Sequence, residues 1–396
     1  MTKLTVKDLN VKGKKVLVRA DYNVPMNDAG EITNSSRIDG SLPTIDYLLD
    51  EGASVILFSH LGRVKKEEDK AGKSLKPVSD YLKEKGYDIT FVPETRGQEL
   101  EEAAESLKAG ELLLVENTRY EDIDGKKEST NDEYLAEYWA SLGDIFVNDA
   151  FGTGHRAHAS NVGLSTYSDQ AALGILFNKE LTTIGATLDQ PESPFVLVLG
   201  GSKVSDKLPV INNLIDKADH ILIGGGMAFT FLKTQGKTIG KSLLEEDLLD
   251  DAKKLLEENG DKIILPVDYV CAEEFSAEAA YETVAGDIPD HLMGLDIGPE
   301  SIALYADYIG KARTVIWNGP MGVFEIEQYA KGTEEMARAI GENTDARSIV
   351  GGGDSVSAVE SLGYADAFSH ISTGGGAMLE LLAGTDLPGV KAIDEK

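Results

Sequence analysis

The sequence predicts an α/β fold made of two doubly wound, parallel-sheet (Rossmann-like) domains. Short apolar runs recur along the 396 residues, and each is followed by glycine or polar residues and then by a helix-like stretch. Continuous apolar strands that alternate with amphipathic helices indicate parallel sheets covered on both faces. About eleven such strands are many for one open sheet, so two domains are expected.

The expected strands recur in both halves of the chain. In the first half they are KVLVR (15–19), SVILF (54–58), ITFV (89–92), ELLLV (111–115) and DIFVN (144–148). In the second half they are FVLVL (195–199), HILI (220–223), KIILPV (262–267), TVIW (314–317), RSIV (347–350) and FSHIS (368–372). Apolar residues three and four apart predict helices between them, for example over 131–143 and 243–260.

The boundary between the two domains is expected near residues 170–190. Residues 178–194, NKELTTIGATLDQPESP, read as a helix followed by a proline-marked loop. We therefore expect an N-terminal domain over 1–172, a connector helix over 173–190 and a C-terminal domain over 191–384.

Composition narrows the classes of function. A formal net charge of −30 repels phosphate backbones and anionic lipid, which argues against nucleic-acid or membrane binding as the main role. The N-terminal stretch MTKLTVKDLNVKGKK lacks the apolar core of a signal peptide, and no apolar run is long enough to span a bilayer, so a cytoplasmic protein is expected. The single cysteine, Cys271, excludes an internal disulfide framework and is expected to be a small core residue.

Cationic and polar side chains follow several strands of the first half. Ligands bind beyond the carboxyl ends of strands in open α/β sheets, and arginine suits a bidentate grip on carboxylate or phosphate. The candidate residues at these ends and in the loop NSSRIDG are Asp21, Asn23, Arg37, His60, Arg63, Arg119 and Arg156, with His155 and His158 beside the last. They predict a site for a small ligand with more than one negative charge.

Glycine-rich loops follow the strands of the second half. They are LGGSKVSDK (199–207), GGGMAF (224–229), WNGPMGVFE (317–325), VGGGDS (350–355) and STGGGAMLELL (372–382). Backbone amides at a helix N-terminus bind anions, and glycine lets a phosphate approach closely. Lys203 and Lys207 add positive charge, and Asp354 is suited to a metal ion that bridges phosphate oxygens. The pattern predicts a nucleotide site.

Several other classes of site lack their sequence signals. There is no G-x-x-x-x-G-K-[ST] motif, which argues against a P-loop protein. GTGHRA (152–157) matches a loose dinucleotide fingerprint, but no acidic residue ends a strand some twenty residues later, so a dehydrogenase is not favoured. Neither an H-E-x-x-H zinc motif nor a G-x-S-x-G nucleophile elbow occurs.

The strings RADYNVP, SHLGR, DAFGTGHRAHAS, GGSKVSDK, WNGPMGVFE, GGGDS and STGGGA, in this order, resemble phosphoglycerate kinases. The resemblance covers the chain from residue 4 to LPGV at 387–390. It implies two doubly wound domains with a central cleft and a hinge, and a C-terminal segment, about 385–396, that returns to the N-terminal domain. Val64, Gly154 and Met378 depart from the family pattern without removing a charged group from the site.

The resemblance also implies a role for each candidate residue. The acid-substrate site would use Asp21, Asn23, Arg37, His60, Arg63, Arg119 and Arg156. The nucleotide site would use Lys203, Lys207, Gly294, Glu325, Gly351, Gly352, Gly353 and Asp354. The catalytic groups would be Arg37, Lys203, Gly374 and Gly375. Asp354 would face the magnesium ion on the nucleotide phosphates, Glu325 would hold the ribose, and MGLD (293–296) with Val323 would flank the adenine.

The reaction implied is reversible phosphoryl transfer between ATP and the carboxylate of 3-phosphoglycerate, with Mg2+, by a glycolytic enzyme expected to be a monomer. The acceptor carboxylate is ionised at neutral pH, which agrees with the absence of a convincing general base. Two alternatives stay open at this point. One is a kinase that forms an acyl phosphate on another small acid, and the other is a non-catalytic two-domain protein that binds an anion.

Overall fold

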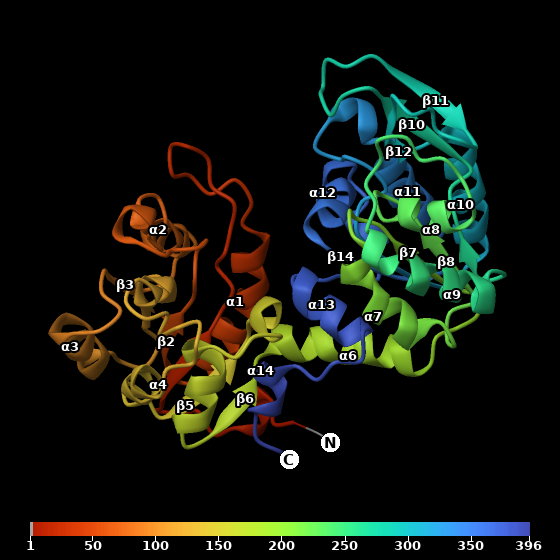
Figure 1. Cartoon of the computed structure of the whole chain (residues 1–396). Helices are drawn as coiled ribbons and strands as arrows, with labels where there is room; N and C mark the ends of the chain where they lie inside the picture. The colour runs from red at the N-terminus through yellow and green to blue at the C-terminus, as the bar shows by residue number, and fades with distance from the viewer. Residues whose placement is uncertain (1–2) are drawn as a thin grey trace. The chain divides into compact units, whose positions relative to one another are not determined.

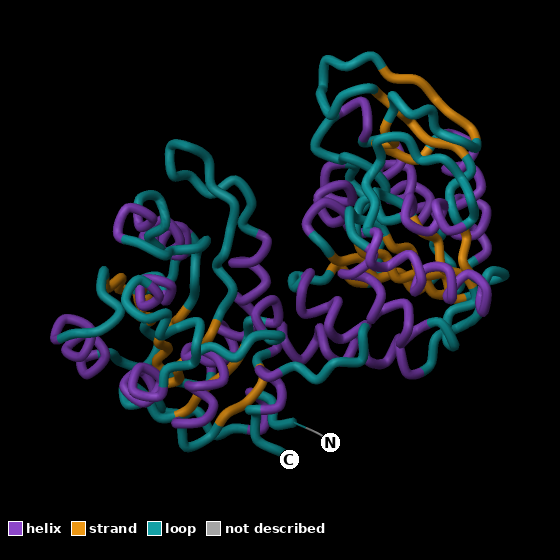
Figure 2. Tube along the Cα trace, in the orientation of Figure 1, coloured by secondary structure: helices purple, strands orange, loops and turns teal. Residues whose placement is uncertain are grey.

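The computed structural model describes residues 3–396, so the first two residues of the expected N-terminal domain lie outside the described part. The chain divides into two compact units. The first runs up to Thr182 and also includes Asp386–Lys396, and the second is Thr183–Thr385. Within each unit, helices flank the strands of a parallel sheet (Figure 1, Figure 2).

The first unit is built on a six-stranded parallel sheet of order β3-β4-β2-β1-β5-β6. Its strands are β1 (Lys15–Arg19), β2 (Ser54–Phe58), β3 (Ile89–Val92), β4 (Leu112–Val115), β5 (Ile145–Asn148) and β6 (Ala171–Leu173). Its helices are α1 (Ser36–Asp50), α2 (Lys76–Glu84), α3 (Gln98–Ser106), α4 (Glu133–Ala140), α5 (Leu164–Tyr167) and α14 (Pro388–Lys391). Short 3-10 helices lie at Val6–Asp8, Glu67–Lys70, Thr118–Asp122 and Phe151–Thr153, and a π-helix at Ala159–Gly163.

The second unit has a six-stranded parallel sheet of order β15-β14-β13-β7-β8-β9 and a three-stranded antiparallel sheet of order β11-β10-β12. The parallel strands are β7 (Phe195–Leu199), β8 (His220–Ile223), β9 (Ile263–Ile264), β13 (Thr314–Asn318), β14 (Arg347–Gly351) and β15 (His370–Ile371). The antiparallel strands are β10 (Asp268–Ala272), β11 (Tyr281–Ala285) and β12 (Met293–Ile297). The helices are α7 (Val204–Leu214), α8 (Ala228–Thr234), α9 (Leu249–Asn259), α10 (Pro299–Lys311), α11 (Lys331–Glu342), α12 (Gly353–Ser361) and α13 (Gly375–Leu382), and 3-10 helices lie at Glu246–Leu248, Glu327–Tyr329 and Ala365–Ala367.

The prediction of two parallel-sheet α/β domains is confirmed, and every expected strand is present in whole or in part. Four strands were missed. β6 has only three residues, AAL, too few for a recognisable run. β11 and β12 each contain an acidic residue, and β11 is largely exposed, so neither is a continuous apolar strand. β10 begins with Asp268, and the four apolar residues after it were overlooked. The helix expected over 243–260 is also shorter than predicted, because α9 begins at Leu249.

Apolar side chains of the strands form the cores. β2 and β7 are buried along their whole length, as the centre of a sheet covered on both faces requires. In the first unit, Val16, Val55 and Ile45 belong to one buried cluster that joins the sheet to α1. Each fully buried side chain of this kind stabilises the fold by roughly 1.5–3 kcal/mol. Within residues 3–396, no helix is both long enough and apolar enough to cross a membrane.

The helix α6 (Ile175–Asp189) begins in the first unit and ends in the second. Its first turn is held by two residues from elsewhere in the first unit. The Thr44 hydroxyl accepts a hydrogen bond from the amide of Ile175 at 2.9 Å, and the Asp149 carboxylate accepts one from the amide of Phe177 at 3.2 Å. A carboxylate at this end also interacts favourably with the helix dipole.

Asp149 is fully buried, and burial raises its pKa to about 7, although hydrogen bonds from Thr44 and from two helix amides oppose the rise. Gly174 leaves room for this carboxyl group, because a Cβ there would lie 2.1 Å from the Asp149 Oδ1. The start of α6 is therefore tied to a carboxyl group that is costly to ionise.

Replacing Asp149 with asparagine is expected to change the pH dependence of stability. The folded pKa of about 7 exceeds the ordinary 3.8, so the folded state binds more protons between these values and the free energy of unfolding falls as pH rises through them. Asp149→Asn removes this loss. The difference in the free energy of unfolding between the variant and the unaltered protein should therefore shift in favour of the variant by on the order of 2–4 kcal/mol from pH 4 to pH 8. Urea unfolding of both proteins at both pH values measures this shift.

The matched control is Asp189→Asn at the other, exposed end of α6. It should change stability equally at both pH values. The same result for Asp149→Asn would show that its carboxyl group does not titrate in the folded protein near neutral pH.

Candidate active site

The polar residues predicted at strand ends in the first unit lie beyond one edge of its sheet. β1 pairs in parallel with β2 and β5, and β2 pairs in parallel with β4, so the carboxyl ends of all four strands share that edge. Asp21 follows β1, His60 follows β2, Arg119 follows β4 and Arg156 follows β5. Residues that are far apart in the sequence are thus brought together by strand order alone.

A cavity of about 610 Å3 at this edge is lined by Arg63, Arg119 and Arg156, and is called here the arginine cavity. Its remaining lining residues are Val64, Lys65, Asp122, Ile123, Gly125, Lys126 and Ser129. The lining therefore contains five cationic side chains and one carboxylate. Partial burial, followed by the positive charges of Arg119 and Arg63, lowers the pKa of Arg156. This concentration of like charge favours an anionic ligand.

The carboxylate in the lining fixes the direction of Arg119. Nη1 of Arg119 donates to Asp122 Oδ2 at 2.9 Å and also to the Ser129 hydroxyl. Ser129 in turn donates to Asp122 through both its amide and its hydroxyl. One edge of the guanidinium is occupied in this way, and its buried Nε has no hydrogen-bond partner among the described residues.

Asp21, Asn23 and Arg37 lie together beside the loop SHLGR. Nη1 of Arg37, in the first turn of α1, donates to the Asn23 carbonyl at 3.0 Å and forms an ion pair with Asp21 at 3.3 Å. The Asn23 Oδ1 accepts a hydrogen bond from the amide of Gly62 at 2.8 Å. Gly62 has φ 64°, which favours glycine at this turn. These contacts join the loop after β1 to the loop after β2.

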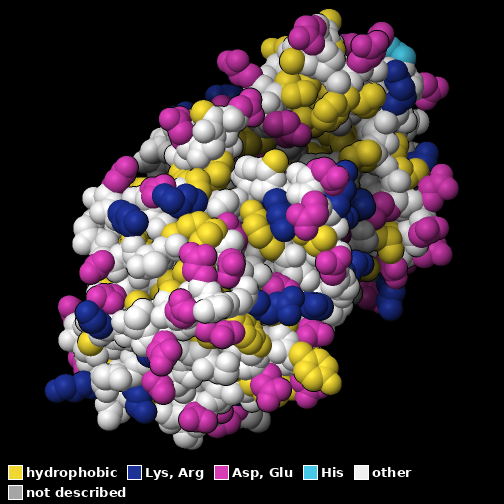
Figure 3. All heavy atoms as spheres, turned by 90° about the vertical axis from the view of Figure 1, so that its left-hand side faces the viewer, with side chains coloured by type: hydrophobic (Ala, Val, Ile, Leu, Met, Phe, Trp, Pro, Cys, Tyr) yellow, Lys and Arg dark blue, Asp and Glu magenta, His cyan; other side chains and the backbone are white. Residues whose placement is uncertain are grey.

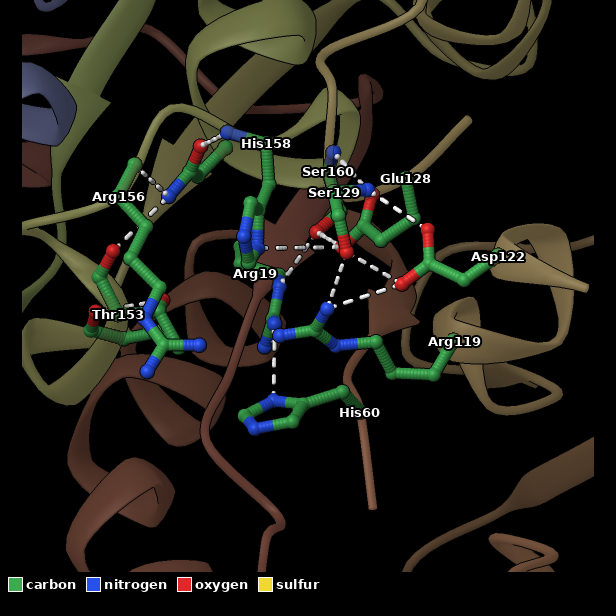
Figure 4. Close-up of polar contacts among 12 residues, drawn as sticks. Arg19, His60, Arg119, Asp122, Glu128, Ser129, Thr153, Arg156, His158 and Ser160 are labelled. Carbon is green, nitrogen blue, oxygen red and sulfur yellow. Dashed lines mark hydrogen bonds and ion pairs between the residues drawn. The ribbon is translucent and has the colours of Figure 1, made fainter. Parts of the chain in front are cut away.

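Sequence reasoning missed the buried polar groups behind these residues, which Figure 4 shows together. Arg19, Glu128 and Ser160 have no exposed surface, and Arg19 contacts His60 at 3.0 Å. The signal for Arg19 was present, since an arginine ends the otherwise apolar run KVLVR. Glu128 and Ser160 lie in loops without a distinctive pattern.

In the second unit, glycines allow the loops after the strands to pack backbone against backbone. A Cβ at Gly200 would lie 2.1 Å from the Pro320 carbonyl oxygen, and one at Gly225 would lie 2.5 Å from the Gly201 carbonyl oxygen. The loops after β7, β8 and β13 therefore meet at the carboxyl edge of the sheet, and side chains at these glycines would separate them.

Two helix N-termini lie side by side at the same edge. Gly352 precedes α12 with φ 100°, and Gly374 precedes α13. A Cβ at Gly375 would lie 3.3 Å from the Gly352 Cα. Free amides at two adjacent helix starts form a site suited to phosphate. Gly351 ends β14, and Gly353 begins α12.

The two predicted lysines have different surroundings. Lys203 is exposed and immediately precedes α7, whereas Lys207 is buried and donates to the Asn318 Oδ1. Burial lowers the pKa of Lys207 to about 8. Sequence reasoning did not single out Asn318, although it ends β13 within WNGPMG; its buried Nδ2 has no hydrogen-bond partner among the described residues.

Asp354 lies near a second carboxylate, because partial burial and then the charge of Glu325 raise the pKa of Asp354. Residues 3–396 contain no cluster of three or more histidine, cysteine, aspartate or glutamate side chains that could hold a metal ion. A single exposed carboxylate beside a phosphate site suits Mg2+, which binds through few carboxylates and keeps water or phosphate as its other ligands. Asp354 therefore fits a magnesium ion that arrives with a nucleotide.

Gly294 lies in β12 of the antiparallel sheet, which sequence reasoning did not predict. A Cβ there would lie 2.1 Å from the ring of Phe229, so glycine is required for the packing of α8 on this strand. The amide of Val323 donates to the Leu295 carbonyl at 2.8 Å. The predicted adenine neighbours, MGLD and Val323, therefore lie beside each other.

Comparison with known proteins agrees with this geometry. The family model for phosphoglycerate kinase matches residues 6–385. The chain belongs to the phosphoglycerate kinase family. Phosphoglycerate kinases of Enterococcus faecalis and Listeria innocua are each 59% identical over 398 residues, and each alignment covers 100% of both chains.

Solved structures of the family have the same fold. Phosphoglycerate kinase from Coxiella burnetii is 40% identical with a TM-score of 0.83, and the one from Pyrococcus horikoshii is 31% identical with a TM-score of 0.85. Each likeness covers 98% of both chains. Membership of this family therefore argues for phosphoglycerate kinase activity. It does not favour the two alternatives, which were a kinase for another small acid and a non-catalytic anion-binding protein.

Proposed function

We propose that the two units divide the substrates of the family's reaction between them. As a phosphoglycerate kinase, the chain transfers a phosphoryl group reversibly between ATP and the carboxylate of 3-phosphoglycerate in glycolysis. The observation that carries the division is the contrast between the arginine cavity of the first unit and the glycine-rich helix starts of the second. A coupled assay of ADP release with 3-phosphoglycerate and MgATP tests the activity.

The first unit would bind the acid substrate. Its phosphate group would enter the arginine cavity, where Arg63, Arg119 and Arg156 offer bidentate donors. Asp21, Asn23, Arg37 and His60 would contact the rest of the molecule, including the carboxylate that accepts the phosphoryl group.

The second unit would bind the nucleotide. Its phosphates would lie at the starts of α12 and α13 and near Lys203 and Lys207, supported by the close packing of the glycine loops. Glu325 would accept hydrogen bonds from the ribose, and Gly294 with the rest of MGLD and Val323 would flank the adenine. Asp354 would hold the magnesium ion, which, when bound, neutralises charge on the phosphate oxygens.

The chemistry needs positioning and positive charge more than proton transfer. The acceptor carboxylate is already ionised at neutral pH, so no general base is required. Lys203, Arg37 and the amides of Gly374 and Gly375 would stabilise the negative charge of the transferring phosphoryl group. Lys203 is the best placed of the two lysines for this role, because it is exposed while Lys207 is bonded to Asn318.

We also propose a cytoplasmic monomer that binds neither nucleic acid nor membrane. The net charge of −30 supports this proposal, since it repels polyanions and copies of the same chain. Acidic side chains are spread over the face in view in Figure 3, with basic side chains scattered between them.

Replacing Lys203 with alanine is expected to lower kcat by on the order of 10²–10³, the size expected for one preorganised donor to a transition state. The affinity for ATP should change much less, because other groups also contact the nucleotide. Steady-state kinetics and calorimetry with ATP measure the two quantities, and Lys253→Ala, on the exposed face of α9, is the control. A near-normal kcat would remove Lys203 from the chemistry and assign the role to Lys207.

Replacing Arg63 or Arg119 with alanine is expected to weaken binding of 3-phosphoglycerate and leave ATP binding intact. Each loss should cost roughly 1.5–3 kcal/mol, as for a hydrogen bond to a charged group. Titration calorimetry with each substrate separately provides the measurement. Equal losses for both substrates would contradict the division between the units.

Direct transfer requires the reacting atoms to come within about 3–3.5 Å, and the two substrates would be held by different units. We propose that a hinge closure on binding both substrates brings them together and excludes water. Small-angle scattering should show the smallest radius of gyration with 3-phosphoglycerate and a non-reacting ATP analogue bound together, and an intermediate change with either alone. An unchanged radius in every state would argue for a preassembled site.

A further inference from the structure

A fully buried arginine lies directly behind the site and has no role in the reaction as described so far. Arg19 is the last residue of β1 and has no exposed surface. Its Nε donates to the Ser160 hydroxyl at 2.8 Å, Nη1 donates to the Ala20 carbonyl, and Nη2 lies 3.0 Å from Nδ1 of His60. The guanidinium therefore joins the sheet, the π-helix at Ala159–Gly163 and the loop after β2.

The charge of Arg19 is balanced by a second buried charge. Glu128 has no exposed surface, and its two carboxylate oxygens accept hydrogen bonds from the amide of Ser160, at 3.0 Å, and from its hydroxyl. Ser160 thus lies between the carboxylate and the guanidinium, as Figure 4 shows. Burial raises the pKa of Glu128, and the charge of Arg19 opposes that rise. Buried charges are expensive, so this arrangement is poorly explained by stability alone.

The contact with His60 has only one chemically consistent form. A guanidinium has five N–H donors, no acceptor, and a pKa too high for it to lose a proton. Nδ1 of His60 must therefore accept the hydrogen bond from Nη2, which leaves the ring proton on Nε2. In Figure 4 the second ring nitrogen lies on the side of the ring away from Arg19.

The surroundings also keep this ring neutral. His60 is almost completely buried, and burial, followed by the positive charges of Arg19, Arg119 and Arg37, lowers its pKa well below the ordinary value. A neutral ring with its proton on Nε2 donates one hydrogen bond there and has no proton to give to the substrate without becoming an anion.

We propose that Arg19, held by Ser160 and Glu128, is a positioning residue that fixes His60 as the neutral Nε2–H tautomer and so makes it a hydrogen-bond donor to the acid substrate. This inference rests on the proposed function, because it takes His60 to contact that substrate. An anionic acceptor needs a donor, whereas the other neutral tautomer would present it with a lone pair.

The planar shape of the Arg19 side chain explains why it can orient the ring of His60. The guanidinium is planar, so fixing Nε against Ser160 also fixes the direction of Nη2 toward His60. Lysine could keep the positive charge, but its single ammonium group cannot occupy both positions. Arg19→Lys therefore removes the orientation of the ring while it retains the buried charge.

The first test is the tautomer of His60 in the ligand-free protein, read from its two ring 15N shifts in long-range 1H–15N correlation spectra. The resonances are assigned by their loss in His60→Asn. The expected result is a single neutral tautomer with the proton on Nε2 from pH 8 down to pH 5. A proton on Nδ1, or a protonated ring in this range, overturns the proposal.

The second test compares variants. In Arg19→Lys the two tautomers should mix, and KM for 3-phosphoglycerate should rise about tenfold, the loss of one oriented hydrogen bond to a charged group, while KM for ATP stays unchanged. Glu128→Gln removes the charge and keeps one acceptor oxygen for Ser160, while the other oxygen becomes an amide donor. It should shift the ring spectrum in the same direction, and it replaces Arg19→Lys as the test if that variant does not fold. The matched control is Arg96→Lys in the same unit, which loses a bidentate ion pair with Glu121 at 2.8 Å and should leave the His60 spectrum unchanged.

Two outcomes of the variant test would count against the proposal. An unchanged His60 spectrum in both Arg19→Lys and Glu128→Gln means that neither residue sets the tautomer. A rise in both KM values in proportion, with the tautomer unchanged, means that Arg19 only stabilises the fold. If His60→Ala leaves KM for 3-phosphoglycerate unchanged, the assignment of His60 in the proposed function fails, and the ligand-free spectra still decide the tautomer.

Discussion

The first unit depends on holding several positive charges close together. Arg63, Arg119 and Arg156 line one cavity, and the charges of Arg119 and Arg63 add to partial burial in lowering the pKa of Arg156. Such a cluster repels itself unless carboxylates compensate it at fixed positions. Asp122 provides one such position at the cavity wall, and Glu128 provides another in the interior. A carboxylate that accepts hydrogen bonds from one edge of a guanidinium, as Asp122 does from Arg119, also fixes the orientation of the whole group.

The proposed nucleotide site of the second unit uses different groups. Its groups are mainly backbone amides at helix starts, which carry partial charges and need no counter-ion. The requirement there is close approach of loops, which is why a Cβ at Gly200, Gly225 or Gly351 would meet other atoms at 2.5 Å or less. Side-chain cations are freely variable in direction and must be fixed by partners, whereas amides are fixed by the helix itself.

This difference explains what the sequence could predict. The strand runs, the glycine loops and the cations at strand ends are local patterns. Within each unit, parallel strand order brings the loops to one edge of the sheet, so the loops after KVLVR and SVILF lie beside each other. The antiparallel strands β11 and β12 were missed because β11 is largely exposed and each contains an acidic residue, so neither is a continuous apolar run. Arg19 contacts Ser160, which is more than 100 positions away in the sequence, and Asp149 contacts Phe177, which is more than 25 positions away. No local pattern reports such contacts.

Two buried polar groups that sequence reasoning missed, Asp149 and Arg19, have similar structural roles. Asp149 supports the start of α6 with a carboxyl group that is costly to ionise, and Arg19 supports His60 with a guanidinium that cannot lose its charge. In both cases a polar group is kept in the interior although an apolar one would cost less to bury. Each determines the direction of a donor or of a helix, which an apolar side chain cannot do. The physical reason to retain them is therefore orientation, and the free energy that they cost is offset by the strands and helices packed around them.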